Sequence, residues 1–238
     1  MNQNIITKIK SRGYWRVNFQ PVVDILKIKN LGDCKDIVEK NAVELRGWDY
    51  PHFPQRRGDD TGIEPGENFY HGWVDWEGNV EFWNLYQSGQ FINYLALEED
   101  WLREDSWQHK LAEKIEPGTV ISITGSVIYQ LTEIFEFLSR LGRSGLYDEG
   151  VFVSISLNNT RGRKLWVSDP GRGRLSAVYD TGADKIEFSK QYTKDDIVTK
   201  SKELALEVIL FIFDHFGWHK PSIDMVKSDQ EKLLRKFI

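Results

Sequence analysis

The stretch FYHGWVDWEGNVEFWNLYQSGQFINY, residues 69–94, decides the fold that this sequence predicts. Glu77-Gly78-Asn79 separates two runs rich in aromatic residues, and Gly and Asn accept the positive φ angles of a tight turn. Successive side chains point to opposite faces of a strand, and both runs place rings on both faces. The stretch therefore predicts an aromatic β-hairpin, interrupted at Ser88-Gly89, in a sheet that is covered on both sides.

The rings around this hairpin are the richest source of buried area in the chain. Five of the nine Trp residues lie between residues 48 and 101. One aromatic side chain can bury about 150–250 Å², so these residues predict a core built on the hairpin. The alternative is that one aromatic face stays exposed and stacks a base, a sugar or a partner chain.

Length and composition are those of a globular protein. The chain has 238 residues, of which 40% are hydrophobic and 28% charged, and no linker rich in Pro, Ser or Gly divides it. These values predict a single domain at residues 13–226, with a flexible N-terminus at 1–12 and a polar, helical tail at 227–238. The net charge of −5 argues against nucleic-acid binding driven by bulk charge, although a local basic patch stays open.

The single cysteine, Cys34, excludes intrachain disulfides and zinc sites made of cysteines. The N-terminus lacks the apolar core of a signal peptide. The longest apolar run, residues 204–213, is too short to span a bilayer. Together these features predict a cytoplasmic protein without membrane contact.

Two segments have the pattern of long helices. In residues 126–141, apolar side chains recur at the spacing of one helical face, and Gly142 and Gly145 end the predicted helix. Residues 194–216 follow Thr193, the first residue of a Thr-Lys-Asp-Asp sequence that resembles a capping box, and their centre is apolar nearly all round. We therefore predict an α+β fold in which a largely antiparallel sheet packs against these two helices.

The remaining pattern predicts shorter elements. Alternating or apolar runs predict strands at 14–19 and 45–50, a helix at 32–43, and a helix that ends at Ile115. Residues 54–68 are rich in Pro, Gly and charge, and predict a long loop. Turn residues predict two more hairpins, which would pair 151–157 with 164–167 and 175–179 with 185–189.

The sequence contains no phosphate-binding loop, dinucleotide fingerprint, zinc-protease motif or EF-hand loop, so no cofactor is predicted. His71, Asp75 and Glu77 cluster on the first arm of the aromatic hairpin, where they could hold a divalent metal for a hydrolase or nuclease. His215 and His219 have zinc-compatible spacing, but Gly217 ends the predicted helix between them.

A basic segment, residues 161–174, is the stronger binding signal. It holds five Lys or Arg residues against one acid, Asp169, and its cations flank a Trp among glycines. Such cations can contact phosphates while the ring stacks on a base. The alternative is an edge that charges protect from aggregation. The candidate binding residues are Arg161, Arg163, Lys164, Trp166, Arg172 and Arg174.

Four quoted segments carry a resemblance to a known group of proteins. LRGWDYPHFP, WNLYQSGQF, TEIFEFLSRLG and ISLNNTRGRKLWVSD resemble uncharacterised bacterial domains associated with chains that carry Schlafen/AlbA-type DNA-binding modules. The resemblance covers about residues 40–170. It implies an accessory domain in a nucleic-acid or defence context, and it assigns no functional residues.

The leading hypothesis is a non-catalytic accessory module that docks a protein partner or a nucleic-acid-containing complex, in a bacterial defence or regulatory system. Its surfaces would be the basic segment, which could also take an acidic ligand, and the aromatic hairpin. The alternative is a metal-dependent hydrolase or nuclease that uses the carboxylates of the hairpin. A third possibility is a purely structural subunit.

Overall fold

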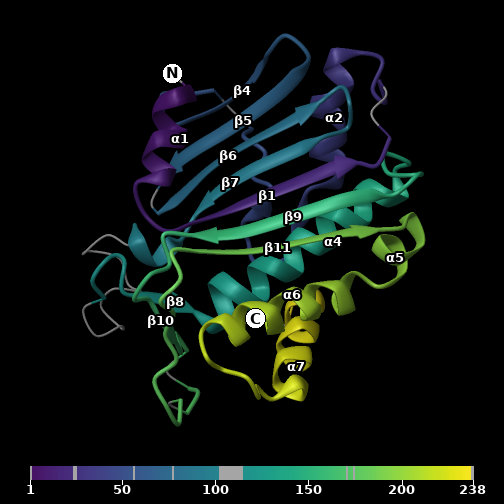
Figure 1. Cartoon of the computed structure of the whole chain (residues 1–238). Helices are drawn as coiled ribbons and strands as arrows, with labels where there is room; N and C mark the ends of the chain where they lie inside the picture. The colour runs from purple at the N-terminus through teal and green to yellow at the C-terminus, as the bar shows by residue number, and fades with distance from the viewer. Residues whose placement is uncertain are drawn as a thin grey trace.

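The computed structural model describes residues 2–23, 26–55, 57–76, 78–101, 115–169, 171–173 and 175–236 (Figure 1). Its centre is a seven-stranded sheet in the order β11-β9-β1-β7-β6-β5-β4, in which all neighbours pair antiparallel. The predicted α+β class with a largely antiparallel sheet is confirmed. The strands are β1 (Tyr14–Pro21), β4 (Thr61–Pro65), β5 (Phe69–Trp76), β6 (Asn79–Tyr86), β7 (Phe91–Ala96), β9 (Val151–Asn158) and β11 (Lys185–Tyr192).

The aromatic hairpin forms as predicted, as β5, β6 and β7. The two connecting turns use positive φ at Gly78 (92°) and Gly89 (84°), which glycine adopts without steric cost. Gly72 faces Trp83 across the β5–β6 pair, and a Cβ at Gly72 would lie 2.5 Å from the indole ring. Glycine at this position therefore lets the Trp83 ring lie flat against β5.

One face of the sheet, called the inner face, packs on helices. Trp15, Val17 and Phe19 point to this face from β1 and are buried. Figure 1 shows α2 (Leu31–Asn41) and α4 (Gln130–Arg143) behind the sheet, with α6 (Ser201–His215) packed on α4. A π-helical turn, Ile123–Tyr129, leads into α4, which accounts for the predicted helix at 126–141. The helix predicted at 194–216 is instead divided at Lys200 into α5 (Lys194–Thr199) and α6.

The opposite, outer face carries α1 (Asn2–Lys10). Ile9 of α1 is fully buried, and it packs with Ile5 against Trp73 and Phe82 in a second, smaller core. The flexible N-terminus predicted for residues 1–12 is therefore a helix over 2–10. Ile5 and Ile9 lie four residues apart and form an apolar stripe that the short, polar segment did not reveal.

Three further predictions differ from the structure, and in two of them strand neighbours were assigned by proximity in sequence. The predicted loop 54–68 contains β4, which pairs with β5 at the sheet edge. Strand β9 is flanked on both sides, by β1 and β11, so it cannot form a hairpin with 164–167. Instead β10 (Lys164–Trp166) pairs in parallel with β8 (Val120–Ser122). Residues 175–179 form no strand, and Tyr179 O accepts from Leu165 N at 2.8 Å.

The remaining described elements are two short strands, a 3₁₀ turn and the C-terminal helix. The predicted strand 45–50 is a short pair, β2 (Val43–Glu44) and β3 (Asp49–Tyr50), and Glu98–Asp100 forms a 3₁₀ turn after β7. The predicted tail is helical, as α7 (Ile223–Leu234), and its Val226 and Leu233 are buried in the main core. The helix expected to end at Ile115 lies largely in 102–114, outside the described residues. Within the described chain, no helix has the length and apolar character that crossing a membrane requires.

Candidate functional site

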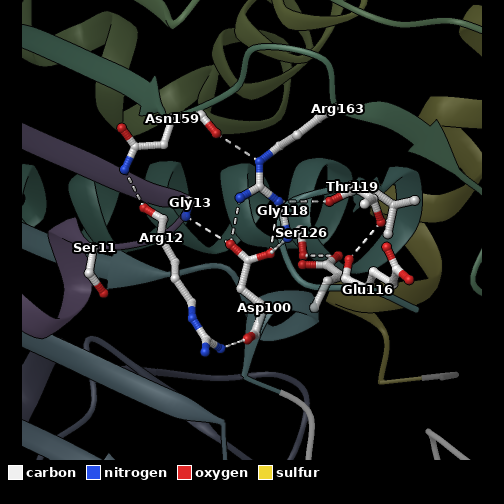
Figure 2. Close-up of polar contacts among 12 residues, drawn as sticks. Ser11, Arg12, Gly13, Asp100, Glu116, Gly118, Thr119, Ser126, Asn159 and Arg163 are labelled. Carbon is white, nitrogen blue, oxygen red and sulfur yellow. Dashed lines mark hydrogen bonds and ion pairs between the residues drawn. The ribbon is translucent and has the colours of Figure 1, made fainter. Parts of the chain in front are cut away.

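Arg163, the central cation of the predicted basic segment, is buried. Its guanidinium binds the Asp100 carboxylate through two bonds of 2.9 and 2.5 Å, and the two side chains are 2% and 1% exposed (Figure 2). Asp100 also accepts the backbone N–H groups of Gly13 (2.8 Å) and Gly118 (2.7 Å). The prediction that Arg163 lies on a binding surface is wrong, because this ion pair joins β1, β8 and the turn after β9 from within.

Arg172 is also engaged internally. Its guanidinium makes two bonds of 2.6 Å to Asp229 of α7, a carboxylate that is 2% exposed. Of the other predicted binding residues, Arg161 and Lys164 are exposed, whereas Trp166 is half-buried. Arg174 lies outside the described residues. The basic segment is therefore not one continuous cationic surface, because its charges point in different directions and two of them are neutralised.

The proposed metal ligands His71 and Asp75 share the outer face of β5. The Asp75 carboxylate binds Lys8 Nζ of α1 at 2.6 Å, and His71 is 5% exposed. Burial lowers the pKa of His71, against the opposing effect of Glu64. Glu77 lies outside the described residues. Among those that are described, no three His, Cys, Asp or Glu side chains are arranged to hold a metal.

The segment LRGWDYPHFP folds over a buried carboxyl group. Glu81 is 2% exposed and accepts hydrogen bonds from His52 N (3.2 Å) and Asn93 Nδ2 (2.7 Å). Burial raises its pKa from 4.5 to about 7, although these bonds favour the charged form. Trp48 stacks between His52 and Trp76, with ring centroids at 4.1 and 5.7 Å. This cluster ties the 48–53 segment to the sheet.

The structure gathers cations where the sequence interpretation placed none. Residues 1–23 contain four Lys or Arg and no Asp or Glu. In the fold, Lys10 Nζ lies 4.8 Å from the centroid of the Tyr94 ring, and the Arg12 guanidinium lies 4.1 Å from that of Trp101. Arg16 is opposite Tyr94 in the β1–β7 register. The acid-free N-terminal segment was the signal that could have indicated this surface.

Two later segments extend this cationic surface. Asn159 Nδ2 donates to the carbonyl oxygens of Lys10 (3.0 Å) and Arg12 (2.6 Å; Figure 2), which holds the turn after β9 against the end of α1. Arg161, two residues farther along this turn, is exposed. Lys185 lies across β9 from Tyr14, since both are in register with Asn158. We call this surface the cationic strip. It comprises Lys10, Arg12, Arg16, Arg161 and Lys185.

Acidic groups near the strip compensate only part of its charge. Glu187 binds Lys185 at 2.8 Å, and this bond lowers the pKa of Glu187. Asp184 is exposed in the preceding turn. The Arg12 guanidinium also donates to the carbonyl oxygen of Asp100, which fixes its position without neutralising its charge. The strip is therefore a positive surface on a chain whose net charge is −5.

Chemically, the cationic strip offers guanidinium and ammonium donors beside partly exposed rings. Tyr14 and Tyr94 lie with their centroids 6.3 Å apart, and burial raises the pKa of Tyr14 further above neutrality, so its hydroxyl stays protonated.

Comparison with protein-family models, with curated proteins and with solved structures finds no match to this chain.

Proposed function

We propose that this chain is a non-catalytic binding module that docks nucleic acid, alone or within a complex, through the cationic strip. The observation that carries the proposal is that Lys10 of α1, Arg16 of β1 and Lys185 of β11 lie on the sheet face that carries Tyr14 and Tyr94. Clustered cations interleaved with rings are the combination that contacts phosphates and stacks bases.

The cationic strip would hold a polyanionic ligand by local contact, and the net charge of the chain gives no long-range attraction to it. Five cations lie on one side of a chain with net charge −5, so long-range attraction alone does not favour an anion, and binding requires local contact. Each phosphate contact releases counterions, so that log K falls with log salt by about 0.7–0.9 per contact. If all five cations contact phosphates, the slope is about −4.

The test uses charge reversal at two exposed positions of the strip. Lys10→Glu/Arg161→Glu changes side chains that are both exposed, so folding should be preserved. We expect the affinity for short labelled oligonucleotides, measured by fluorescence anisotropy, to fall roughly tenfold or more and the salt slope to become shallower. Lys220→Glu/Lys227→Glu is the matched control, because its exposed lysines lie near α7, at the other end of the molecule from α1 (Figure 1).

The outcomes separate three explanations. Absence of oligonucleotide binding by the unaltered chain would overturn the proposal. Equal losses in the strip variant and in the control would show that only net charge matters. If instead an acidic protein binds to the strip and oligonucleotides do not, the module docks a protein partner.

A further inference from the structure

Beyond the cationic strip, the outer face of the sheet remains open. Of the described helices, only α1 packs on this face, and it contacts β5, β6 and β7 near their ends at Trp76, Asn79 and Ala96 (Figure 1). The surface beyond α1 continues across β6, β7, β1 and β9. The strand register shows which side chains lie on this surface, and no other described helix packs on it.

The open part of the face is organised in cross-strand rows. The first row runs from Phe82, which is buried beneath α1, through the partly exposed Tyr94 to Arg16 of the cationic strip. The next row is uncharged and comprises Asn84, the apolar Ile92, Asn18 and Ser154, of which Asn18 and Ser154 are buried. Phe69 and Tyr86 form a ring pair farther out, with centroids 5.1 Å apart. The face therefore changes from cationic to amide-bearing to aromatic.

Asn84 supplies an independent indication of a ligand on this face. Its Oδ1 is buried and has no hydrogen-bond partner among the described residues. A buried acceptor without a partner costs about 1–3 kcal/mol in general, so such groups are usually satisfied by water or by a ligand. The neighbouring Asn18 differs, because its Oδ1 accepts from Gln90 Nε2 at 2.8 Å. The Asn84 side chain is partly exposed, so a rotation about its χ angles would present this oxygen to a donor from outside the chain, such as the amino group of a base.

We infer that the ligand of this module is single-stranded nucleic acid, with its phosphates on the cationic strip and its bases on the open outer face. The inference rests on the proposed function and deepens it. In a duplex the bases are stacked inside, where the rings and amides of a flat sheet cannot reach them. An unpaired strand can instead place one base beside Tyr94 and another over the Phe69–Tyr86 pair.

The first arm of the test needs no variant. The unaltered chain is titrated with labelled single-stranded DNA, with single-stranded RNA of the same sequence, and with the DNA duplex. We expect both single strands to bind at least about tenfold tighter than the duplex, because only they can stack on the rings. A preference between DNA and RNA would identify the source of the strand without changing the inference.

The second arm separates stacking from charge. Tyr86→Ala should weaken single-strand binding by about tenfold and leave duplex binding unchanged, whereas Tyr86→Phe, which keeps the ring, should bind as the unaltered chain does. Trp76→Ala is the control, because Trp76 is 49% exposed but points to the inner face, where it stacks on Trp48. Circular dichroism establishes that each variant is folded.

The possible failures are distinguishable. Equal affinity for single strands and duplex, with no effect of Tyr86→Ala, would overturn this inference while the proposed function stands. Loss of binding to every oligonucleotide in the unaltered chain would overturn both. If Tyr86→Ala does not fold, the comparison of single strands with duplex in the unaltered chain still decides.

Discussion

At the scale of single residues, the Arg163–Asp100 pair shows why a sequence-level basic segment is a poor guide to exposure. Both charges are almost fully buried, and the carboxylate also accepts two backbone N–H groups. A buried ion pair of this kind is costly to break, because removal of one partner leaves the other charge without compensation. Its position indicates a structural role for Arg163.

Asp100→Ala should therefore destabilise the protein strongly. The guanidinium of Arg163 would remain buried without its counter-ion, at a cost of about 3–5 kcal/mol in the free energy of unfolding. Urea denaturation measures this loss. Asp148→Ala is the control, because the Asp148–Lys194 pair is exposed on both sides and its removal should change little. Equal stability of the two variants would contradict a structural role for the buried pair.

Glu81 should make stability depend on pH. Its pKa is raised from 4.5 to about 7 in the folded protein, so the folded state keeps a proton that the unfolded state loses. The stabilisation is fully present below pH 4.5 and is lost as the pH rises through 7. The difference amounts to about 3 kcal/mol from the size of the shift.

The pH dependence is measured by urea unfolding between pH 5 and 8. Glu81→Gln removes the titrating group, so we expect a flatter profile and a relative gain in stability at the alkaline end. An unchanged slope in the variant would assign the pH dependence to another group.

At the scale of elements, α1 is the helix that creates the candidate surface. It places Lys10 over Tyr94 and holds the turn at Asn159 beside it. Its attachment depends on the small outer core around Ile9, which is fully buried. The same helix leaves the rest of the outer face open, so its length determines how much of the sheet a ligand could reach.

Ile9→Ala should detach or loosen α1. The lost burial and the cavity left behind cost about 2–4 kcal/mol. We expect a lower thermal midpoint and weaker oligonucleotide binding, since Lys10 and Arg12 would no longer be positioned. Asn4→Ala, at an exposed position of the same helix, should change neither property. A truly flexible N-terminus would make both substitutions neutral.

At the scale of the whole molecule, the C-terminal helix belongs to the folded body. Val226 and Leu233 of α7 are buried in the main core. Asp229 of the same helix forms an ion pair with Arg172, which is distant from it in the sequence. The segment is therefore more than a polar extension. Its removal exposes apolar surface of the core and leaves Arg172 without its carboxylate partner.

A chain that ends at Ser222 should consequently be much less stable. We expect a lower urea midpoint and a lower dependence of the unfolding free energy on urea concentration, because less surface is buried on folding. In the full chain, tryptophan fluorescence and circular dichroism should report the same transition. Coincident, unchanged transitions in the shortened chain would show that α7 contributes nothing to the core.

By itself, the sequence determined the elements whose signals are local. Alternation and turn residues were sufficient for β1, β5, β6 and β7, because side chains alternate between faces over a few residues and Gly78 and Gly89 accept positive φ. Helical spacing located α4, and the apolar run located α6. The α+β class followed from these elements alone.

Only the tertiary structure decided which strands are neighbours and which charges are exposed. Strand β9 pairs with β1, which precedes it by more than a hundred residues, and a local pattern contains no information about such a partner. Arg161 and Arg163 are two residues apart, yet one is exposed and the other is buried against Asp100. The cationic strip likewise unites residues 10–16 with residues 161 and 185, since antiparallel pairing brings β1, β9 and β11 side by side.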